Sequence, residues 1–146
     1  MARVGMIENI VSSSEEETIR AGEQFSVRLK PGDVVAVYGD LGSGKTRFVK
    51  GISRGLGIAE KVTSPTFVVV NEHFGGMIPL YHFDFYRLRS VKELEEIGFD
   101  DYLFGDGVCV LEWADLIREK LPDRRYDVHC AFGDRETVRI ISISTL

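Results

Sequence analysis

The sequence has few cysteines, no long apolar segment and no excess of positive charge. Its two cysteines, Cys109 and Cys130, lie in apolar, strand-like stretches without a CxxC neighbour. We therefore expect two reduced, buried thiols rather than a disulfide or a metal pair. No apolar run approaches the roughly 20 residues of a membrane span, and the first residues lack an apolar segment with a small-residue cleavage site. These absences predict a cytoplasmic protein without a membrane partner.

The charge balance also limits the partners. The net charge of −5 argues against tight, unaided binding of nucleic acid, because such binding usually needs a strong positive excess. A local basic patch is still compatible with this value, but we expect no DNA partner. The 146 residues contain no internal repeat, low-complexity tract or linker, and this length fits one domain with a genuine core.

A glycine-rich segment, GDLGSGKT, matches the pattern GxxxxGK[ST]. Its glycines allow backbone N–H groups to curve around phosphate oxygens, and the following helix presents its positive end to the same anion. In such a loop Lys45 reaches the β- and γ-phosphates and the Thr46 hydroxyl ligates Mg²⁺. A buried strand pattern precedes the segment and a helical pattern follows it, as the motif requires. The predicted phosphate loop consists of Gly39, Asp40, Leu41, Gly42, Ser43, Gly44, Lys45 and Thr46.

The rest of the chain alternates between strand and helix patterns. Serines at 12–14 and Ser90 are each followed three residues later by a glutamate, which is typical of a helix start. We expect helices over 14–28, 45–57, 90–103 and 114–121, strands over 33–38 and 107–113, and hairpins over 67–86, around Gly75–Gly76, and 126–144, near Gly133–Asp134. This order predicts an α/β fold, a single P-loop NTPase-like domain over residues 1–146 with a mixed central sheet and helices packed against it.

A bound Mg²⁺ also needs a carboxylate, usually at the end of an apolar strand beside the loop. Two stretches supply one: VCVLEW ends near Glu112, and PLYHFDFY carries Asp84. Because strand side chains alternate between faces, Tyr81, Phe83 and Phe85 are expected on a core face, and His82, Asp84 and Tyr86 on a face equipped for chemistry. With the phosphate loop present, a Mg²⁺ role for Glu112 is favoured over an ordinary strand-end acid. His82 is interpreted as a packed, hydrogen-bonded residue.

Two further features concern the nucleotide. The segment VTSPT follows the helix after the loop, where a hydroxyl closes on the γ-phosphate in GTPases and their relatives. Thr66 or Thr63 would supply that hydroxyl, and a plain strand-entry turn is an equal alternative. The chain has no [NT]KxD tetrad and no DxxG, the segments that GTPases use for guanine and for their second switch. ATP is therefore the expected nucleotide.

Five segments together resemble one family. GDLGSGKT, SPTF, YHFDFYRL, ELEEIGFDDYL and VCVLEW occur in the order and near the spacing of TsaE proteins (formerly YjeE), from about Ser12 to the last hairpin. The family provides the ATPase of bacterial tRNA threonylcarbamoyladenosine synthesis. Two departures are Ser43, where alanine is common, and Ala114, where a proline often follows the Glu-Trp pair.

The resemblance implies roles for individual residues. Lys45 and Thr46 would take the phosphate-loop roles, Glu112 would be a Mg²⁺ ligand, and Asp84 would be the acid needed for hydrolysis, by placing the attacking water. Thr66 would belong to a switch-like segment and Trp113 would lie beside the nucleotide. Glu15 and Arg135 match positions that approach the bound nucleotide.

The resemblance also implies the partners. ATP and Mg²⁺ would be the cofactors, and the chain would hydrolyse ATP while docked on the TsaB–TsaD pair, which transfers the threonylcarbamoyl group to tRNA. Hydrolysis would then support or reset the turnover of that pair, and tRNA would be contacted only through the complex.

Two other functions stay open on the residues alone. A small-molecule kinase would use the same loop, with Arg87 and Arg89 clamping an acceptor, although the chain has no long insertion that offers a lid. A binding module would hold ATP as a structural ligand without hydrolysing it.

Overall fold

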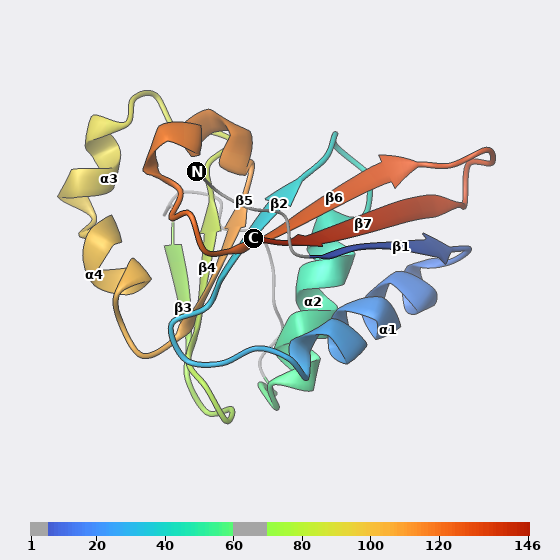
Figure 1. Cartoon of the computed structure of the whole chain (residues 1–146), viewed down its shortest axis with the longest axis horizontal. Helices are drawn as coiled ribbons and strands as arrows, with labels where there is room; N and C mark the ends of the chain where they lie inside the picture. Colours follow the sequence, from blue (N-terminus) through green and yellow to red (C-terminus); the bar gives the residue numbers. More distant parts are fainter. Residues whose placement is uncertain (1–5, 60–69) are drawn as a thin grey trace.

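The computed structural model describes residues 6–59 and 70–146, which form a mixed β-sheet with helices on both faces (Figure 1). Within these ranges the sheet has seven strands in the order β1-β7-β6-β2-β5-β4-β3. The strands are β1 (Met6–Ser12), β2 (Val34–Tyr38), β3 (Val70–His73), β4 (Leu80–Asp84), β5 (Val108–Glu112), β6 (Tyr126–Phe132) and β7 (Arg139–Thr145). The helices are α1 (Glu15–Ser26), α2 (Lys45–Gly55), α3 (Lys92–Glu96), α4 (Phe99–Leu103) and the 3-10 helix η1 (Ala114–Lys120). The predicted α/β fold with a mixed sheet is confirmed.

The centre of the sheet is parallel and its edges are antiparallel. β2 pairs in parallel with both β5 and β6, and β4 pairs in parallel with β5. Both predicted hairpins are present among the described residues, as the antiparallel pairs β3–β4 and β6–β7. Because β2, β4 and β5 run in the same direction, their carboxyl ends meet at one edge, the usual place for a ligand in sheets of this kind.

Both faces of the central strands are buried. On β2, Val35 and Val37 pack toward α1 and α2, whereas Val34, Ala36 and Tyr38 pack in a second core with residues of α3, α4 and η1. All five residues of β2 and of β5 are buried. Such burial on two faces is the reason for the continuous apolar runs in these strands, since neither face needs polar side chains.

The two cysteines lie in these cores. Cys109 and Cys130 are free and buried, and burial raises the pKa of each thiol to about 12. Both are therefore protonated at neutral pH and pack as small apolar side chains. The prediction of two reduced, buried thiols is confirmed.

The start of α1 is fixed by a capping box, as its serines and glutamates predicted. Ser14 is the N-cap, and its side chain accepts a hydrogen bond from the Glu17 N–H at 3.1 Å. The Glu17 carboxylate in turn accepts from the N–H of Ser13 at 2.6 Å. These bonds satisfy N–H groups that a helix start leaves without partners.

The structure adds one strand that the sequence pattern did not predict. β1 forms an edge of the sheet and pairs antiparallel with β7. Ile10 packs against the first core, but Ile7 and Val11 on this strand are exposed. Because its apolar residues do not keep to one face, the stretch lacks the alternation by which a half-buried strand is recognised.

The single helix predicted over 90–103 is wrong. The chain forms two short helices there, α3 and α4, which are separated at Gly98, a residue with φ of 71°. The predicted capping box at Ser90 is also wrong, because Val91 is the N-cap of α3 and no side chain caps it. Gly98 adopts a left-handed conformation that ends one helical segment and allows the next to start in a new direction.

The helix predicted over 114–121 is a 3-10 helix rather than an α-helix. Its backbone departs from helical geometry at Ile117, where φ is −128° and ψ is 30°. Ala114 and Ile117 are fully buried in the second core. Ala114 thus occupies the position after the Glu-Trp pair as the first, buried residue of η1, a position that also accommodates proline.

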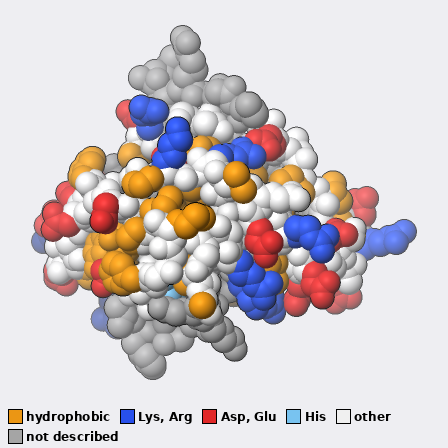
Figure 2. Space-filling view, turned by 90° about the horizontal axis from the view of Figure 1, so that it is seen from below, with side chains coloured by type: hydrophobic (Ala, Val, Ile, Leu, Met, Phe, Trp, Pro, Cys, Tyr) orange, Lys and Arg blue, Asp and Glu red, His pale blue; other side chains and the backbone are white. Residues whose placement is uncertain are grey.

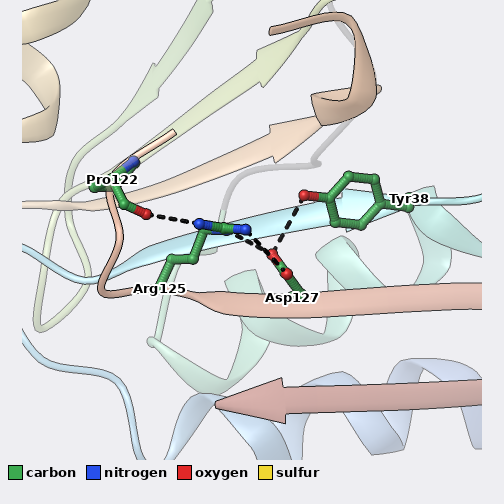
Figure 3. Close-up of polar contacts among 4 residues, drawn as sticks. All are labelled: Tyr38, Pro122, Arg125 and Asp127. Carbon is green, nitrogen blue, oxygen red and sulfur yellow. Dashed lines mark hydrogen bonds and ion pairs between the residues drawn. The ribbon is translucent and has the colours of Figure 1, made fainter. Parts of the chain in front are cut away.

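A polar network joins the end of β2 to the start of β6 (Figure 3). The guanidinium of Arg125 donates to both carboxylate oxygens of Asp127, at 2.8 and 3.3 Å, and to the carbonyl oxygen of Pro122 at 2.9 Å. The hydroxyl of Tyr38 donates to the same carboxylate at 3.3 Å. Burial, followed by the negative charge of Asp127, raises the pKa of Tyr38 to about 12. Because Tyr38 immediately precedes Gly39, the network anchors the residue from which the phosphate loop departs.

Helices α1 and α2 pack with their backbones in contact on one face of the sheet (Figure 1). A Cβ atom at Gly51 would lie 1.9 Å from the carbonyl oxygen of Ile19, and one at Gly22 would lie 2.1 Å from that of Phe48. Farther along both helices, a Cβ at Gly55 would lie 1.8 Å from the hydroxyl oxygen of Ser26. Since the early residues of α1 contact the early residues of α2, the helices run parallel, and both begin at the same edge of the sheet.

The surface over these helices carries charges of both signs. Figure 2 shows acidic and basic side chains interspersed on the side of the molecule that carries α1. Two ion pairs involve residues of these helices or next to them: Arg28–Glu8, at 2.5 Å, and Arg54–Glu23, at 4.0 Å. None of the helices in the described ranges combines the length and the apolar composition that crossing a bilayer requires.

The helix contact predicts the effect of one substitution. Gly51→Ala should lower the free energy of unfolding by about 2 kcal/mol, because the new methyl group forces the helix backbones apart. In an exposed helix the same change would stabilise the protein by up to about 1 kcal/mol, so the sign of the effect is diagnostic. Urea unfolding followed by circular dichroism measures it, with Gln24→Ala on the exposed side of α1 as the control. A Gly51→Ala variant as stable as the control would contradict the close packing.

Candidate functional site

The glycine-rich loop lies at the carboxyl end of β2 and leads directly into α2. Gly39, Gly42 and Gly44 have φ angles of 146°, 79° and 105°, which residues with a side chain rarely adopt. A Cβ at Gly39 would also lie 2.4 Å from the carbonyl oxygen of Cys130 and 2.5 Å from Ser43 Oγ. Glycine is therefore required along this path, which ends at the N-terminus of α2, where the first N–H groups have no partner within the helix.

A cavity of about 570 Å³ opens beside this loop. Its walls come from the start of α1, the loop, the first turn of α2, the ends of β4 and β5, and the turn between β6 and β7. Leu41, Gly42 and Gly44 line it. Asp40 is exposed and Ser43 is buried behind the loop. The N–H of Ser43 donates a hydrogen bond to the carbonyl oxygen of Asp40. The volume is in the usual range for a small-molecule site.

Lys45 is buried at the base of the cavity. Its ammonium donates to the carbonyl oxygen of Gly39 and lies 3.4 Å from the centroid of the Trp113 ring. Burial lowers the pKa of Lys45, and the carboxylates of Glu112 and Asp84 act in the opposite direction. Among the described residues, no carboxylate forms an ion pair with the Lys45 ammonium at contact distance. An anion that enters the cavity can therefore bind to this ammonium.

Thr46 and Glu112 bring two oxygen ligands together. The Thr46 hydroxyl donates to Glu112 Oε1 at 3.4 Å, and Glu112 is almost fully buried at the end of β5. Hydroxyl and carboxylate oxygens are the donors that Mg²⁺ prefers. Within the described ranges no three His, Cys, Asp or Glu side chains cluster as an all-protein metal cage. This donor set fits Mg²⁺, which is commonly held by one or two protein ligands together with substrate phosphates and water.

Asp84 lies at the end of β4, directly beside Glu112 in the parallel pairing of β4 with β5. Its half-buried carboxylate accepts a hydrogen bond from the Tyr86 N–H at 3.0 Å and faces the cavity. Burial raises the pKa of Asp84, the Tyr86 N–H lowers it, and the nearby Glu112 carboxylate raises it further. The carboxylate is thus a stronger base than an exposed one, and it is positioned at the cavity wall.

The alternation predicted for β4 is only partly right. Tyr81, Phe83 and Phe85 share the second core, as expected. The opposite face, however, is also buried at Leu80 and His82, whereas Asp84 at the strand end and Tyr86 just beyond it line the cavity. Residues of the first core, which come from distant parts of the chain, cover this face. The sequence of the strand alone therefore does not predict its burial.

Trp113 follows Glu112 and lines the cavity. Its φ of 58° makes it the one non-glycine residue with positive φ among the described residues. Left-handed geometry costs a bulky residue about 1–2 kcal/mol and persists where the surrounding structure imposes it, often at functional sites. The ring lies over Lys45 and 5.0 Å from the ring of Tyr86. Tyr86, which the strand alternation placed on the same face as Asp84, is half-exposed and lines the same cavity.

Glu15 and Arg47 stand at the rim where the two helices begin. Glu15 is the first residue of α1, lines the cavity, and forms an exposed ion pair with Arg47 at 3.4 Å. Both side chains lie within reach of a ligand at the two helix starts. Because the pair is exposed, it contributes little to stability.

The hairpin contributes Glu136, Thr137 and Arg139 to the cavity wall, but not Arg135. Arg135 is exposed in the turn between β6 and β7 and is absent from the described cavity lining. Arg139 donates from Nε to the Gly42 carbonyl oxygen at 3.2 Å, and its guanidinium lies 4.5 Å from the centroid of the Phe132 ring. It therefore ties the hairpin to the phosphate loop. No motif marks Arg139, since it meets the loop only through the pairing of β7 with β6.

Thr63 and Thr66, with the whole VTSPT segment, lie outside the described residues. Their roles stay predictions from the sequence. The predicted residues that the structure does bring together at the cavity are Leu41, Gly42 and Gly44 of the loop, Lys45, Thr46, Asp84, Glu112, Trp113 and Glu15.

Comparison with known proteins identifies relatives of the whole chain. Residues 12–140 match the family model described as threonylcarbamoyl adenosine biosynthesis protein TsaE. The tRNA threonylcarbamoyladenosine biosynthesis protein TsaE of Bacillus subtilis is 48% identical over 113 residues, covering 77% of this chain and 70% of the relative. The protein of the same name from Treponema pallidum is 43% identical over 129 residues, covering 86% of this chain and 95% of the relative.

A solved structure has the same fold. The crystal structure of YdiB from Bacillus subtilis aligns with a TM-score of 0.81 at 35% sequence identity, over 99% of this chain and 88% of that one. The fold, the family model and the curated relatives agree over most of the sequence. The chain therefore belongs to the TsaE family of tRNA threonylcarbamoyladenosine biosynthesis proteins.

Proposed function

We propose that this protein hydrolyses ATP in the cytoplasm in support of tRNA threonylcarbamoyladenosine synthesis, acting on the TsaB–TsaD pair to sustain or reset its turnover. The observation that carries the ATPase part is the meeting of Lys45, Thr46, Glu112 and Asp84 in one cavity beside a glycine-rich loop. Membership of the TsaE family supports the link to this modification and to its other proteins.

The cavity supports the proposed nucleotide binding. The phosphates of ATP would rest on the loop and at the N-terminus of α2, where the helix dipole and N–H groups without a partner within the helix favour an anion. α1 starts at the same cavity and adds a second positive helix end. The Lys45 ammonium would face the β- and γ-phosphates and would exchange the Gly39 carbonyl and the Trp113 ring for phosphate oxygens.

Hydrolysis would use the two strand-end carboxylates in different roles. Thr46 and Glu112 would hold Mg²⁺, which offsets the negative charge on the phosphates during the reaction. Asp84 would orient the attacking water and accept its proton, a task that a carboxylate with a raised pKa performs better than an ordinary one. The buried position of Glu112 and the half-exposed position of Asp84 suit this division, because the water must enter from the cavity.

The proposal predicts partner-dependent hydrolysis. Phosphate release from ATP by the purified chain should be slow alone and faster with TsaB, TsaD and substrate tRNA. Lys45→Ala should abolish the signal by removing the charge that faces the phosphates, whereas Lys50→Ala, on the same helix outside the cavity lining, should retain the basal rate. A rate unaffected by the partner proteins would contradict the switching role and favour a search for a small phosphoryl acceptor.

A second prediction separates binding from hydrolysis. Asp84→Asn should still bind ATP, since it keeps the side-chain shape and removes a negative charge near the phosphates, but its turnover should fall by about 100-fold or more. Titration calorimetry measures the affinity and phosphate release measures the turnover. Asp115→Asn, an exposed carboxylate outside the cavity lining, is the matched control. If Asp84→Asn kept normal tRNA modification without hydrolysis, ATP would serve only as a structural ligand.

Trp113 should report binding, because it is the only tryptophan in the chain. Phosphates that draw the Lys45 ammonium from the indole ring should change its fluorescence in a saturable way. The change should be absent in Lys45→Ala, whose ring has no cation to lose. Constant emission at an ATP–Mg²⁺ concentration that saturates binding by calorimetry would show that the ring is not near the bound phosphates.

A further inference from the structure

His82 is buried in the sheet at a point that the proposed chemistry does not use. It lies in β4, two residues before Asp84 and on the same side of the strand, and it has no exposed surface. Its own position is paired with Val110 of β5, and the pair Asp84–Glu112 follows two residues later. The imidazole therefore lies below the two strand-end carboxylates, on the side away from the cavity.

The ring of His82 contacts one oxygen of Glu112 and leaves the other oxygen free for a second contact. His82 Nε2 forms a short hydrogen bond with Glu112 Oε2, and both side chains are almost fully buried. Glu112 Oε1 accepts from the hydroxyl of Thr46. The two carboxylate oxygens are thus distinguished: Oε2 points into the sheet and Oε1 points to the first turn of α2.

The hydrogen-bond pattern indicates which ring nitrogen is the donor. A buried carboxylate needs hydrogen-bond donors for its oxygens, because burying a carboxylate without such partners costs several kcal/mol. His82 Nδ1 has no hydrogen-bond partner among the described residues, so the hydrogen that the geometry can use lies on Nε2. An imidazole that donates to a carboxylate holds the carboxylate plane as well as one oxygen, as outer residues do in many metal sites.

We infer that His82 is a positioning residue for Mg²⁺: by holding Glu112 Oε2, it fixes Oε1 beside the Thr46 hydroxyl, where the two oxygens can serve as ligands of one cation. This inference rests on the proposed Mg²⁺ role of Glu112. It differs from a merely structural account, in which His82 only satisfies a buried charge and the orientation of Oε1 is irrelevant.

The test compares two amides of different reach. His82→Gln places its side-chain nitrogen near the position of Nε2 and should keep the bond to Glu112, whereas His82→Asn is too short to reach it. The measured quantity is the affinity for ADP by calorimetry, with and without Mg²⁺, in the full chain. Mg²⁺ should increase the affinity for ADP, and half of this increase is reached at a certain Mg²⁺ concentration. We expect that concentration to be about 10-fold or more higher in His82→Asn than in the wild type, in the range found for outer metal-site residues. Affinity for ADP without Mg²⁺ should stay unchanged, and His82→Gln should behave nearly as the wild type.

The controls distinguish the failure of this inference from the failure of the proposed function. If Mg²⁺ does not strengthen ADP binding in the wild type, or if Glu112→Gln retains the full effect, the proposed metal site is wrong and the inference falls with it. A different outcome would count against His82 alone. In that outcome Mg²⁺ strengthens ADP binding in the wild type and equally in His82→Asn, but not in Glu112→Gln.

A measurement on the wild type covers the case in which His82→Asn does not fold. The ¹⁵N resonance of His82 Nε2 should shift when Mg²⁺ is added to the ADP-bound protein, because a cation at Oε1 withdraws charge from the carboxylate that the ring holds. A resonance that does not move while Mg²⁺ strengthens ADP binding would overturn the inference.

Discussion

The contact between α1 and α2 is the constraint on which the site depends. Gly22 and Gly51 let the backbones of two parallel helices touch, and the contact brings both helix starts to the same edge of the sheet. α2 begins at the phosphate loop and α1 begins at Glu15, so two positive helix ends face one cavity. Like ends of parallel helices repel each other, and the three glutamates in the first turn of α1 offset that repulsion.

The second constraint is the pairing of β4 with β5. The parallel register sets Asp84 beside Glu112, and a shift by one residue would turn either side chain to the opposite face. Two neighbouring carboxylates would repel each other in isolation, but here each has its own donor: the Tyr86 N–H for Asp84, and His82 for Glu112. The Lys45 ammonium nearby acts on both. The charges of the site therefore form one connected arrangement rather than a set of independent residues.

The sequence predicted the features that arise from local chemistry. The glycine loop, the buried strands, both hairpins and the cap at Ser14 follow from short patterns, and the structure contains them. The sequence did not predict β1, whose apolar residues lie on both faces of an edge strand, or the break at Gly98. It also missed Arg139 at the cavity, because this residue reaches it through strand pairing and not through a motif. His82 was read as a packed histidine, which its burial supports, but its contact with Glu112 depends on the register of two strands separated by α3 and α4.

The order of assembly follows from where the cavity walls lie in the chain. Ser13 contributes near the start and Arg139 near the end, and β1, at the edge of the described sheet, pairs with β7. During synthesis the phosphate loop emerges long before β7 does, and the long-range pairing of β1 with β7 is the slow kind of contact. A nascent chain therefore carries the loop without a closed cavity. The cavity walls are complete only after the β6–β7 hairpin has left the ribosome and paired with β1.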